Sequence, residues 1–253
     1  MNKLPAITLS FWVMKICATT LGETAGDLLS MTLNVGYAAS SLILVSLFLL
    51  TLIGQLRARS YNPALYWSVI LATSTAGTTL SDFMDRTLGL GYAIGSAVLV
   101  ALLIAIFTIW YLSEKSLSVE HIESRRGELF YWAAILFSNT LGTALGDYLA
   151  DDSGLGFAGG ALLIGSLITM VAAAKYLTRL SPVLLFWLAF VLTRPFGATL
   201  GDFLSKPLDH GGLGFGTLGS SAALATLLVM LVVGAVWSSR RERATGFTAA
   251  PNS

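Results

Sequence analysis

One pattern occurs four times along the chain and constrains the fold more than any other feature. A tryptophan is followed ten residues later by a glycine and fifteen residues later by an aspartate, with glycine or serine directly before the aspartate. Four matches without a gap indicate internal duplication, so we expect four copies of one structural unit. The matching residues are Trp12, Gly22 and Asp27; Trp67, Gly77 and Asp82; Trp132, Gly142 and Asp147; and Trp187, Gly197 and Asp202.

Composition indicates the medium in which these units fold. The 253 residues are 55% hydrophobic and only 11% charged, whereas soluble domains carry about 25% charged residues. The net charge of +1 gives no sign of a nucleic-acid partner. Cys17 is the single cysteine, which excludes an intramolecular disulfide and a cysteine metal site. We therefore expect an integral membrane protein surrounded by lipid.

Each repeat contains two apolar runs of about 20 residues, the length that spans a bilayer. The sequence thus predicts an all-α membrane protein with eight transmembrane helices, built from four two-helix repeats. The predicted spans are 6–32, 34–55, 64–85, 90–112, 129–150, 155–177, 182–204 and 213–237. The predicted repeats are 6–56, 62–112, 128–178 and 182–238, with a linker at 113–127 between two halves and a tail at 239–253.

The positive residues predict the orientation. Most Lys and Arg follow the second span of a repeat, as in "QLRARSYNP" and "SEKSLSVEHIESRRGE". The turns within repeats are short and rich in Gly and Asp, as in "ADDSGLG". Because basic loops stay in the cytoplasm, we expect both termini, the linker and the tail on that side.

Two spans per repeat give every repeat the same orientation, unlike the inverted repeats of many transporters. The four aspartates would then share one depth. With the tryptophans as anchors at the cytoplasmic interface and a rise of about 1.5 Å per residue, each carboxyl would lie roughly 22 Å from that interface. The simplest arrangement is a pseudo-fourfold ring of acids.

Hydroxyl groups accompany each aspartate. Positions three, four and seven residues earlier share its helix face, and they predict a polar stripe to which Glu23 adds a second acid. Such oxygen ligands suit hard cations or protons. We therefore predict ion binding by Asp27, Asp82, Asp147 and Asp202, the candidate metal ligands, together with Glu23; no other cofactor is expected. The supporting residues are Thr20, Thr24, Thr75, Thr78, Thr79, Thr140, Thr143 and Thr199.

Arg194 is the second unusual residue in these spans. It lies eight residues before Asp202, directly ahead of Pro195. It could serve as a counter-ion to the acids, or it could bind backbone carbonyls freed by a proline kink. An ionisable group at the bilayer centre costs about 2.5–3.5 kcal/mol on an insertion scale, which favours a functional role for the aspartates over purely structural hydrogen bonds.

The repeat pattern resembles a bacterial integral membrane family defined by a four-fold repeat of unknown function. The resemblance covers about 11–237 and rests on the four tryptophans with their glycine and aspartate partners. It implies a multi-pass protein of the bacterial inner membrane with four repeats. It implies no activity.

Three functions remain open. The first is a cation transporter or channel for protons or a small divalent ion such as Mn²⁺ or Ca²⁺, with lipid and that ion as partners. The second is a non-transporting scaffold or sensor whose buried acids are structural; the third is a small-molecule exporter with an aromatic-walled apolar pocket. We expect no enzyme, because no nucleophile–base pair or nucleotide-binding motif is present. Oligomeric state is not indicated.

Overall fold

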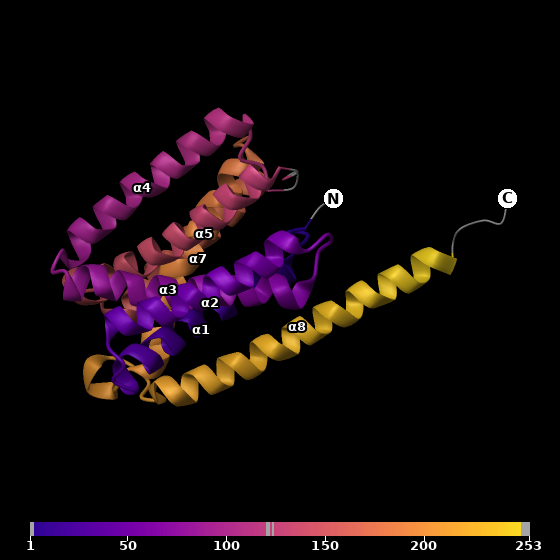
Figure 1. The fold of residues 1–253 in the computed structure, drawn as a ribbon. Helices are drawn as coiled ribbons and strands as arrows, with labels where there is room; N and C mark the ends of the chain where they lie inside the picture. The colour runs from indigo at the N-terminus through magenta and orange to yellow at the C-terminus, as the bar shows by residue number, and fades with distance from the viewer. Residues whose placement is uncertain (1–2, 120–121, 123, 249–253) are drawn as a thin grey trace.

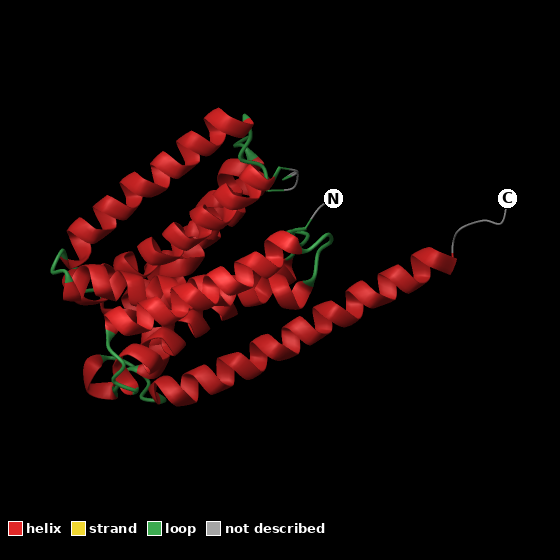
Figure 2. Ribbon diagram, in the orientation of Figure 1, coloured by secondary structure: helices red, strands yellow, loops and turns green. Residues whose placement is uncertain are grey.

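The structure is a computed structural model that describes residues 3–119, 122 and 124–248. Within these ranges the chain forms helices joined by loops (Figure 2). The eight long helices are α1 (Leu9–Asp27), α2 (Tyr37–Arg57), α3 (Pro63–Asp82), α4 (Gly91–Glu114), α5 (Arg125–Asp147), α6 (Gly156–Leu177), α7 (Pro182–Ser205) and α8 (Gly216–Thr248).

Each repeat contributes two of these helices, and the turn after the aspartate has its own geometry. In three repeats the α-helix changes to a π-helical turn directly after the aspartate, in η1 (Leu28–Thr32), η2 (Phe83–Thr87) and η3 (Tyr148–Asp152). In the fourth repeat α7 continues to Ser205 and a 3-10 turn follows, η4 (Leu208–His210). Such π-helical turns are frequent at functional sites, and here they mark the aspartate end of the molecule.

The helices with aspartates form an inner ring. α1, α3, α5 and α7 contact one another in cyclic order, so that α7 also contacts α1. Each second helix packs against the first helix of the following repeat: α2 on α3, α4 on α5 and α6 on α7. α8 completes the series by packing on α1, along the lower side of the bundle in Figure 1. The last repeat therefore closes the ring against the first.

Six helices are long and apolar enough to cross a membrane: α2, α4, α5 with η3, α6, α7 and α8 up to Ser239. The expected eight spans match the eight helices in position, but α1 and α3 fall below this apolarity. The reason is their place in the inner ring. Their threonines and their charged groups are buried, as are Ser74 and Ser81 of α3, so these residues need not face lipid.

Glycines allow the inner helices to approach closely. A Cβ added to Gly77 of α3 would lie 2.9 Å from the backbone carbonyl carbon of Asn139 on α5. The same relationship recurs around the ring. The equivalent pairs are Gly22 with Ser74, Gly142 with Arg194 and Gly197 with Thr19. Small residues at such seams are typical of helix packing in membranes.

Aromatic side chains fill the opposite end of the inner ring. Trp67, Trp132 and Trp187 are buried there, although we expected the repeat tryptophans to anchor helices at the interface. They are buried because they lie on inner helices, whose surroundings are other helices. The Tyr66 and Tyr131 hydroxyls form a 2.7 Å hydrogen bond in the same layer.

The C-terminal boundary differs from the sequence prediction. α8 runs to Thr248 and extends past the bundle in Figure 1. Residues 239–248 of the expected tail are therefore helical. Residues 249–253 lie outside the described residues. The expected linker at 113–127 overlaps the ends of α4 and α5, which stop at Glu114 and start at Arg125.

Candidate functional site

The interior of the inner ring is built in layers, each with one residue from every inner helix. Residues four apart lie on one helix face, so steps of four from the aspartates toward the tryptophans generate successive layers. All of these residues are buried. Below the aspartates the layers are Glu23, Thr78, Thr143 and Ala198; then Thr19, Ser74, Asn139 and Arg194; then Lys15, Ile70, Ile135 and Phe190.

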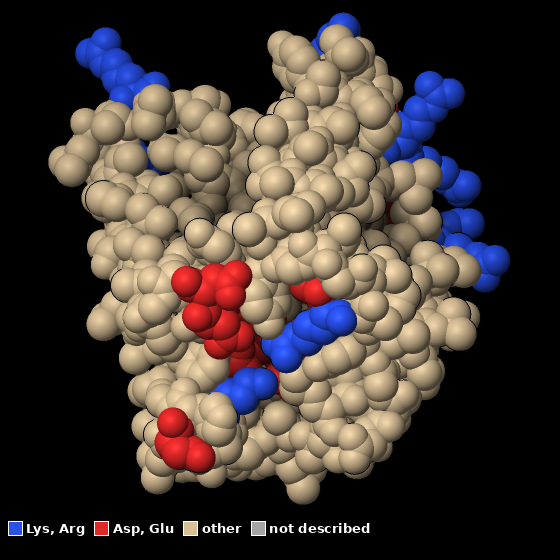
Figure 3. Space-filling view, turned by 90° about the vertical axis from the view of Figure 1, so that its left-hand side faces the viewer, with Lys and Arg blue, Asp and Glu red and all other residues tan. Residues whose placement is uncertain are grey.

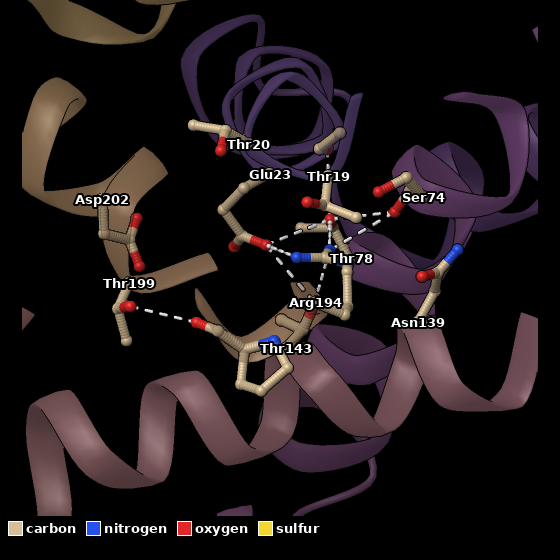
Figure 4. A network of polar contacts seen from close by, with 12 residues as sticks. Thr19, Thr20, Glu23, Ser74, Thr78, Asn139, Thr143, Arg194, Thr199 and Asp202 are labelled. Carbon is tan, nitrogen blue, oxygen red and sulfur yellow. Dashed lines mark hydrogen bonds and ion pairs between the residues drawn. The ribbon is translucent and has the colours of Figure 1, made fainter. Parts of the chain in front are cut away.

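Glu23 and Arg194 form the centre of this interior (Figure 4). Arg194 Nη1 donates to Glu23 Oε2 at 2.9 Å, and both side chains are almost fully buried. Arg194 Nη2 donates to the hydroxyls of Thr78 at 2.6 Å and Thr143 at 2.7 Å. Both threonine hydroxyls also lie 3.3 Å from Glu23 Oε2. All four inner helices thus meet in one network.

The fourth repeat makes this network asymmetric. Ala198 offers only a methyl group where the other repeats have Glu23, Thr78 and Thr143. Arg194, one layer away on the same helix, reaches into that layer with its guanidinium. Of the two interpretations of Arg194, the geometry matches the counter-ion: its backbone acceptor is Ser74 on α3, at 3.4 Å, rather than a carbonyl beside Pro195.

Two cations cover the aspartate layer. Arg86 Nε lies 2.9 Å from Asp82 Oδ1, and its Nη2 lies 3.5 Å from Asp147 Oδ2. Lys206 Nζ lies 2.8 Å from Asp27 Oδ2 and 3.3 Å from Asp202 Oδ1. Each cation therefore bridges carboxylates of two different repeats, and together they join all four aspartates at one end of the ring.

Sequence reasoning did not identify Arg86 and Lys206 as partners of the acids. The signal was present, since each lies four residues after its own aspartate and so on the same helix face. Burial by itself lowers the pKa of Lys206, but the carboxylates of Asp202 and Asp27 outweigh it and raise this pKa above its usual range. Lys206 is therefore charged at neutral pH.

Three of these acids also converge on one another. Glu23, Asp147 and Asp202 each offer a carboxylate oxygen, and these atoms all lie within 4.8 Å of one another. We call these three residues the carboxylate cluster. The ion pairs of the aspartate and Glu23 layers use three cations, Arg86, Arg194 and Lys206, for five buried carboxylates. Two negative charges remain, which matches two protons or one divalent cation.

The carboxylate cluster is connected to the molecular surface at the aspartate end. A cavity of about 300 Å³ there is lined by residues that include Arg86, Asp151, Asp202 and Lys206. Figure 3 views this end, where acidic and basic side chains lie side by side near the centre of the face, among mostly uncharged residues. At the opposite end the buried rings of Tyr66, Tyr131 and Trp132 fill the interior. Among the described residues, the cavity that reaches the cluster therefore opens at the aspartate end.

The predicted threonine stripe divides into two groups. Thr78 and Thr143 join the central network, as described. The hydroxyls of the other threonines donate mainly to carbonyls of their own helices, and Thr24 also accepts from Ser221 of α8 at 2.9 Å. These self-bonded residues are Thr20, Thr24, Thr75, Thr79, Thr140 and Thr199. Only the position four residues before the aspartate reaches the centre.

Comparison with known proteins bears on the repeats. A family model described as Repeat of Unknown Function (DUF347) matches residues 10–61, 65–116, 130–181 and 185–241. Comparisons with curated proteins and with solved structures gave no match. The four matched segments confirm the four tandem repeats that the sequence predicts. Because they cover most of its length, the chain belongs to the DUF347 family of repeats of unknown function.

Proposed function

We propose that the protein is a membrane carrier for a small cation, which binds at the carboxylate cluster. The observation that carries this proposal is the convergence of Glu23, Asp147 and Asp202. The aspartate and Glu23 layers hold two more carboxylates than the cations that pair with them. An uncompensated buried charge is costly. A cation that binds at the cluster would neutralise this charge, and its release would restore it.

The proton is the favoured ion. Calcium requires six to eight oxygen ligands, whereas the cluster brings three carboxylates together and Arg194 already engages the hydroxyls of Thr78 and Thr143. Three nearby cations also oppose a divalent ion electrostatically. A proton needs a single oxygen, so it meets these conditions best; Mn²⁺ or Ca²⁺ is the second choice.

We place the eight helices across a bacterial inner membrane in a pseudo-fourfold arrangement. Six of them are sufficiently apolar, and the outer helices expose large apolar side chains such as Leu42 and Leu162, at 71% and 73%. The basic loops favour cytoplasmic termini. The aspartate end then faces outward, and the aromatic layer closes the interior on the cytoplasmic side.

This closure favours a carrier over an open channel. The described side chains leave access to the carboxylate cluster from the aspartate end, while the aromatic layer fills the other end. Transport would need a second conformation in which the aromatic layer opens. Rigid-body movement of helix pairs around a fixed site is the usual way to achieve this.

The scaffold remains the second candidate because a specific observation favours it. Glu23 pairs with Arg194 and Asp27 pairs with Lys206, and both ion pairs join α1 to α7 or its end. Donors on neighbouring helices are what a scaffold predicts. A scaffold does not require more buried carboxylates than the cations that pair with them.

The small-molecule exporter also has an observation in its favour. An apolar groove of about 640 Å³ between the end of α4 and the start of α7 has walls formed by Phe107, Tyr111 and Trp187. The groove lies near the tryptophan end and does not include the buried acids. It supplies no reason for those acids, so we rank this function third.

Flux measurements in proteoliposomes test the proposal. Purified protein is reconstituted with an internal pH dye or a Mn²⁺ or Ca²⁺ indicator, and a gradient of each ion is imposed. We expect proton flux in the wild type and a loss of at least about tenfold in Asp147→Asn, since one proton site is removed. Asp209→Asn, at a fully exposed loop acid, is the matched control. Absence of flux for every ion in the wild type would favour the scaffold.

A further inference from the structure

Lys15 is a buried basic residue that the carboxylate cluster does not use. It lies on α1 and is fully buried. Its layer, between the Glu23–Arg194 centre and the aromatic end, is otherwise formed by Ile70, Ile135 and Phe190. One amine therefore stands in an apolar layer of the inner ring.

Apart from the face of one aromatic ring, which attracts a cation, the surroundings of Lys15 offer little to an ammonium group. Its Nζ lies 3.4 Å from Asn139 Oδ1 and 4.1 Å from the centre of the Phe190 ring. An ammonium has three N–H donors, and this single acceptor is at the long end of the hydrogen-bond range. Asn139 in turn donates its Nδ2 to Thr73 Oγ1 at 3.1 Å, so its orientation is fixed.

The three cations that pair with the acids of the aspartate and Glu23 layers differ from Lys15 in one respect. Arg194, Arg86 and Lys206 all lie within 4 Å of a carboxylate. Lys15 has no carboxylate at ion-pair distance among the described residues. A buried charge without a partner is strongly disfavoured relative to the neutral form.

The charged and titratable groups around Lys15 supply no negative charge that would compensate an ammonium. On α7 the nearest layer holds Arg194, a cation whose charge is engaged by Glu23. On α3 and α5 the following layer holds the Tyr66 and Tyr131 phenols, which bond each other. α8, which also packs on α1, has no titratable residue between Gly216 and Ser239.

We propose that Lys15 is a separate internal proton-binding site, present as a neutral amine in this conformation. Its nitrogen lone pair accepts a proton to give an ammonium, and release of the proton restores the amine. Because the site lies between the carboxylate cluster and the closed end, a proton bound there is on the path toward the cytoplasmic side. This transport role rests on the proposed function, whereas proton binding by Lys15 does not.

Nuclear magnetic resonance of the full-length protein in detergent tests the protonation state. The chain has five lysines, which are labelled with ¹³C at Cε, and Lys15→Met identifies the signal of interest. We expect that signal to have the shift of a neutral amine at pH 7.5 and to convert to that of an ammonium on acidification. A signal that keeps the chemical shift of an ammonium at every pH from 6 to 9 would overturn the proposal.

A pair of substitutions gives an independent test. Lys15→Met preserves the length of the side chain without charge, so we expect the melting temperature to stay the same or rise. Lys15→Arg places an obligatory charge in the same space, so we expect a lower melting temperature or failure to fold. The reverse order, with Arg tolerated and Met destabilising, would show a structural cation and would contradict the proposal.

Proton flux in proteoliposomes then separates this proposal from the proposed function. If the wild type carries protons, Lys15→Met should reduce the rate at least tenfold, and an unchanged rate would exclude Lys15 from the path. If the wild type carries neither protons nor Mn²⁺ or Ca²⁺ while its Lys15 signal still titrates, the proposed function fails and the proton-binding site stands.

Discussion

Arg194 of α7 and Glu23 of α1 form a buried ion pair at the point where all four inner helices meet, with 2.9 Å between Nη1 and Oε2. Neither residue has a counterpart of its kind in the other repeats. The pair therefore breaks the fourfold similarity of the repeats and forms one charged contact between the first and last repeats. Each charge of the pair is compensated by the other in a buried environment.

We predict strong coupling between these two residues. Removing one partner of a buried ion pair typically costs about 3–5 kcal/mol, because the other charge is left uncompensated. Glu23→Gln and Arg194→Met should each lower the free energy of unfolding by about that amount, while the double variant should lose much less than the sum. Denaturant unfolding in detergent measures all three. Additive losses would show that the pair is not an energetic unit.

Lys206→Met should destabilise the protein in a pH-dependent way. The folded-state pKa of Lys206 is raised above its usual value by Asp202 and Asp27. A raised folded pKa means that the stabilisation is fully present below the unfolded pKa, about 10.4, and is lost as pH rises through the folded pKa.

The difference in melting temperature between wild type and Lys206→Met should therefore be constant from pH 7 to pH 9 and shrink only at higher pH. Lys175→Met, at an exposed lysine of α6, is the matched control and should show no such difference. A difference that already disappears by pH 9 would argue against the ion pairs of Lys206.

Gly77→Ala tests the close approach of the inner helices. The added methyl would lie 2.9 Å from a backbone carbon of Asn139, which cannot move away as a flexible side chain could. Overpacking of this kind costs about 1–3 kcal/mol. Gly234→Ala in α8 is the control, because nothing lies within 4 Å of its added methyl. Equal melting temperatures for the two variants would mean that the α3–α5 seam can widen freely.

The proposed orientation can be tested by thiol labelling in cells. Cys17 is the single native cysteine and is buried, so it gives a low background. A membrane-impermeant maleimide added from outside should label Asp209→Cys, in the turn between α7 and α8. It should not label Arg179→Cys, between α6 and α7, until the cells are opened. The opposite pattern would place the aspartate end in the cytoplasm.

Much of the architecture follows from local features of the sequence. The spacing of Trp12, Trp67, Trp132 and Trp187 predicted the repeats. The apolar runs predicted helices within a few residues of the observed bounds, except at the C-terminal end of α8. Local periodicity also identifies which residues share a helix face, so Thr78 and Thr143 could be predicted to lie on the same face as the aspartates of their repeats.

Helix partners could not be obtained in the same way. Periodicity does not tell which helix a face will meet, so the packing of each outer helix on the next repeat was not predicted. For the same reason Thr24 was expected near the acids but contacts Ser221 of α8. Lys15 was missed because a single basic residue in an apolar run has no local signature of a partner.

The contact between α8 and α1 has a consequence for biogenesis. α1 is synthesised before the other described helices, yet the arginine that neutralises Glu23 lies 171 residues later in the chain. The helix that covers α1, α8, follows the other seven long helices. In the proposed membrane topology, the first helix is therefore inserted with its acid unpaired until α7 has been synthesised. In that topology a nascent chain that stops before α7 lacks the arginine that pairs with Glu23, so its first helix keeps an uncompensated acid, a cost that the complete molecule avoids.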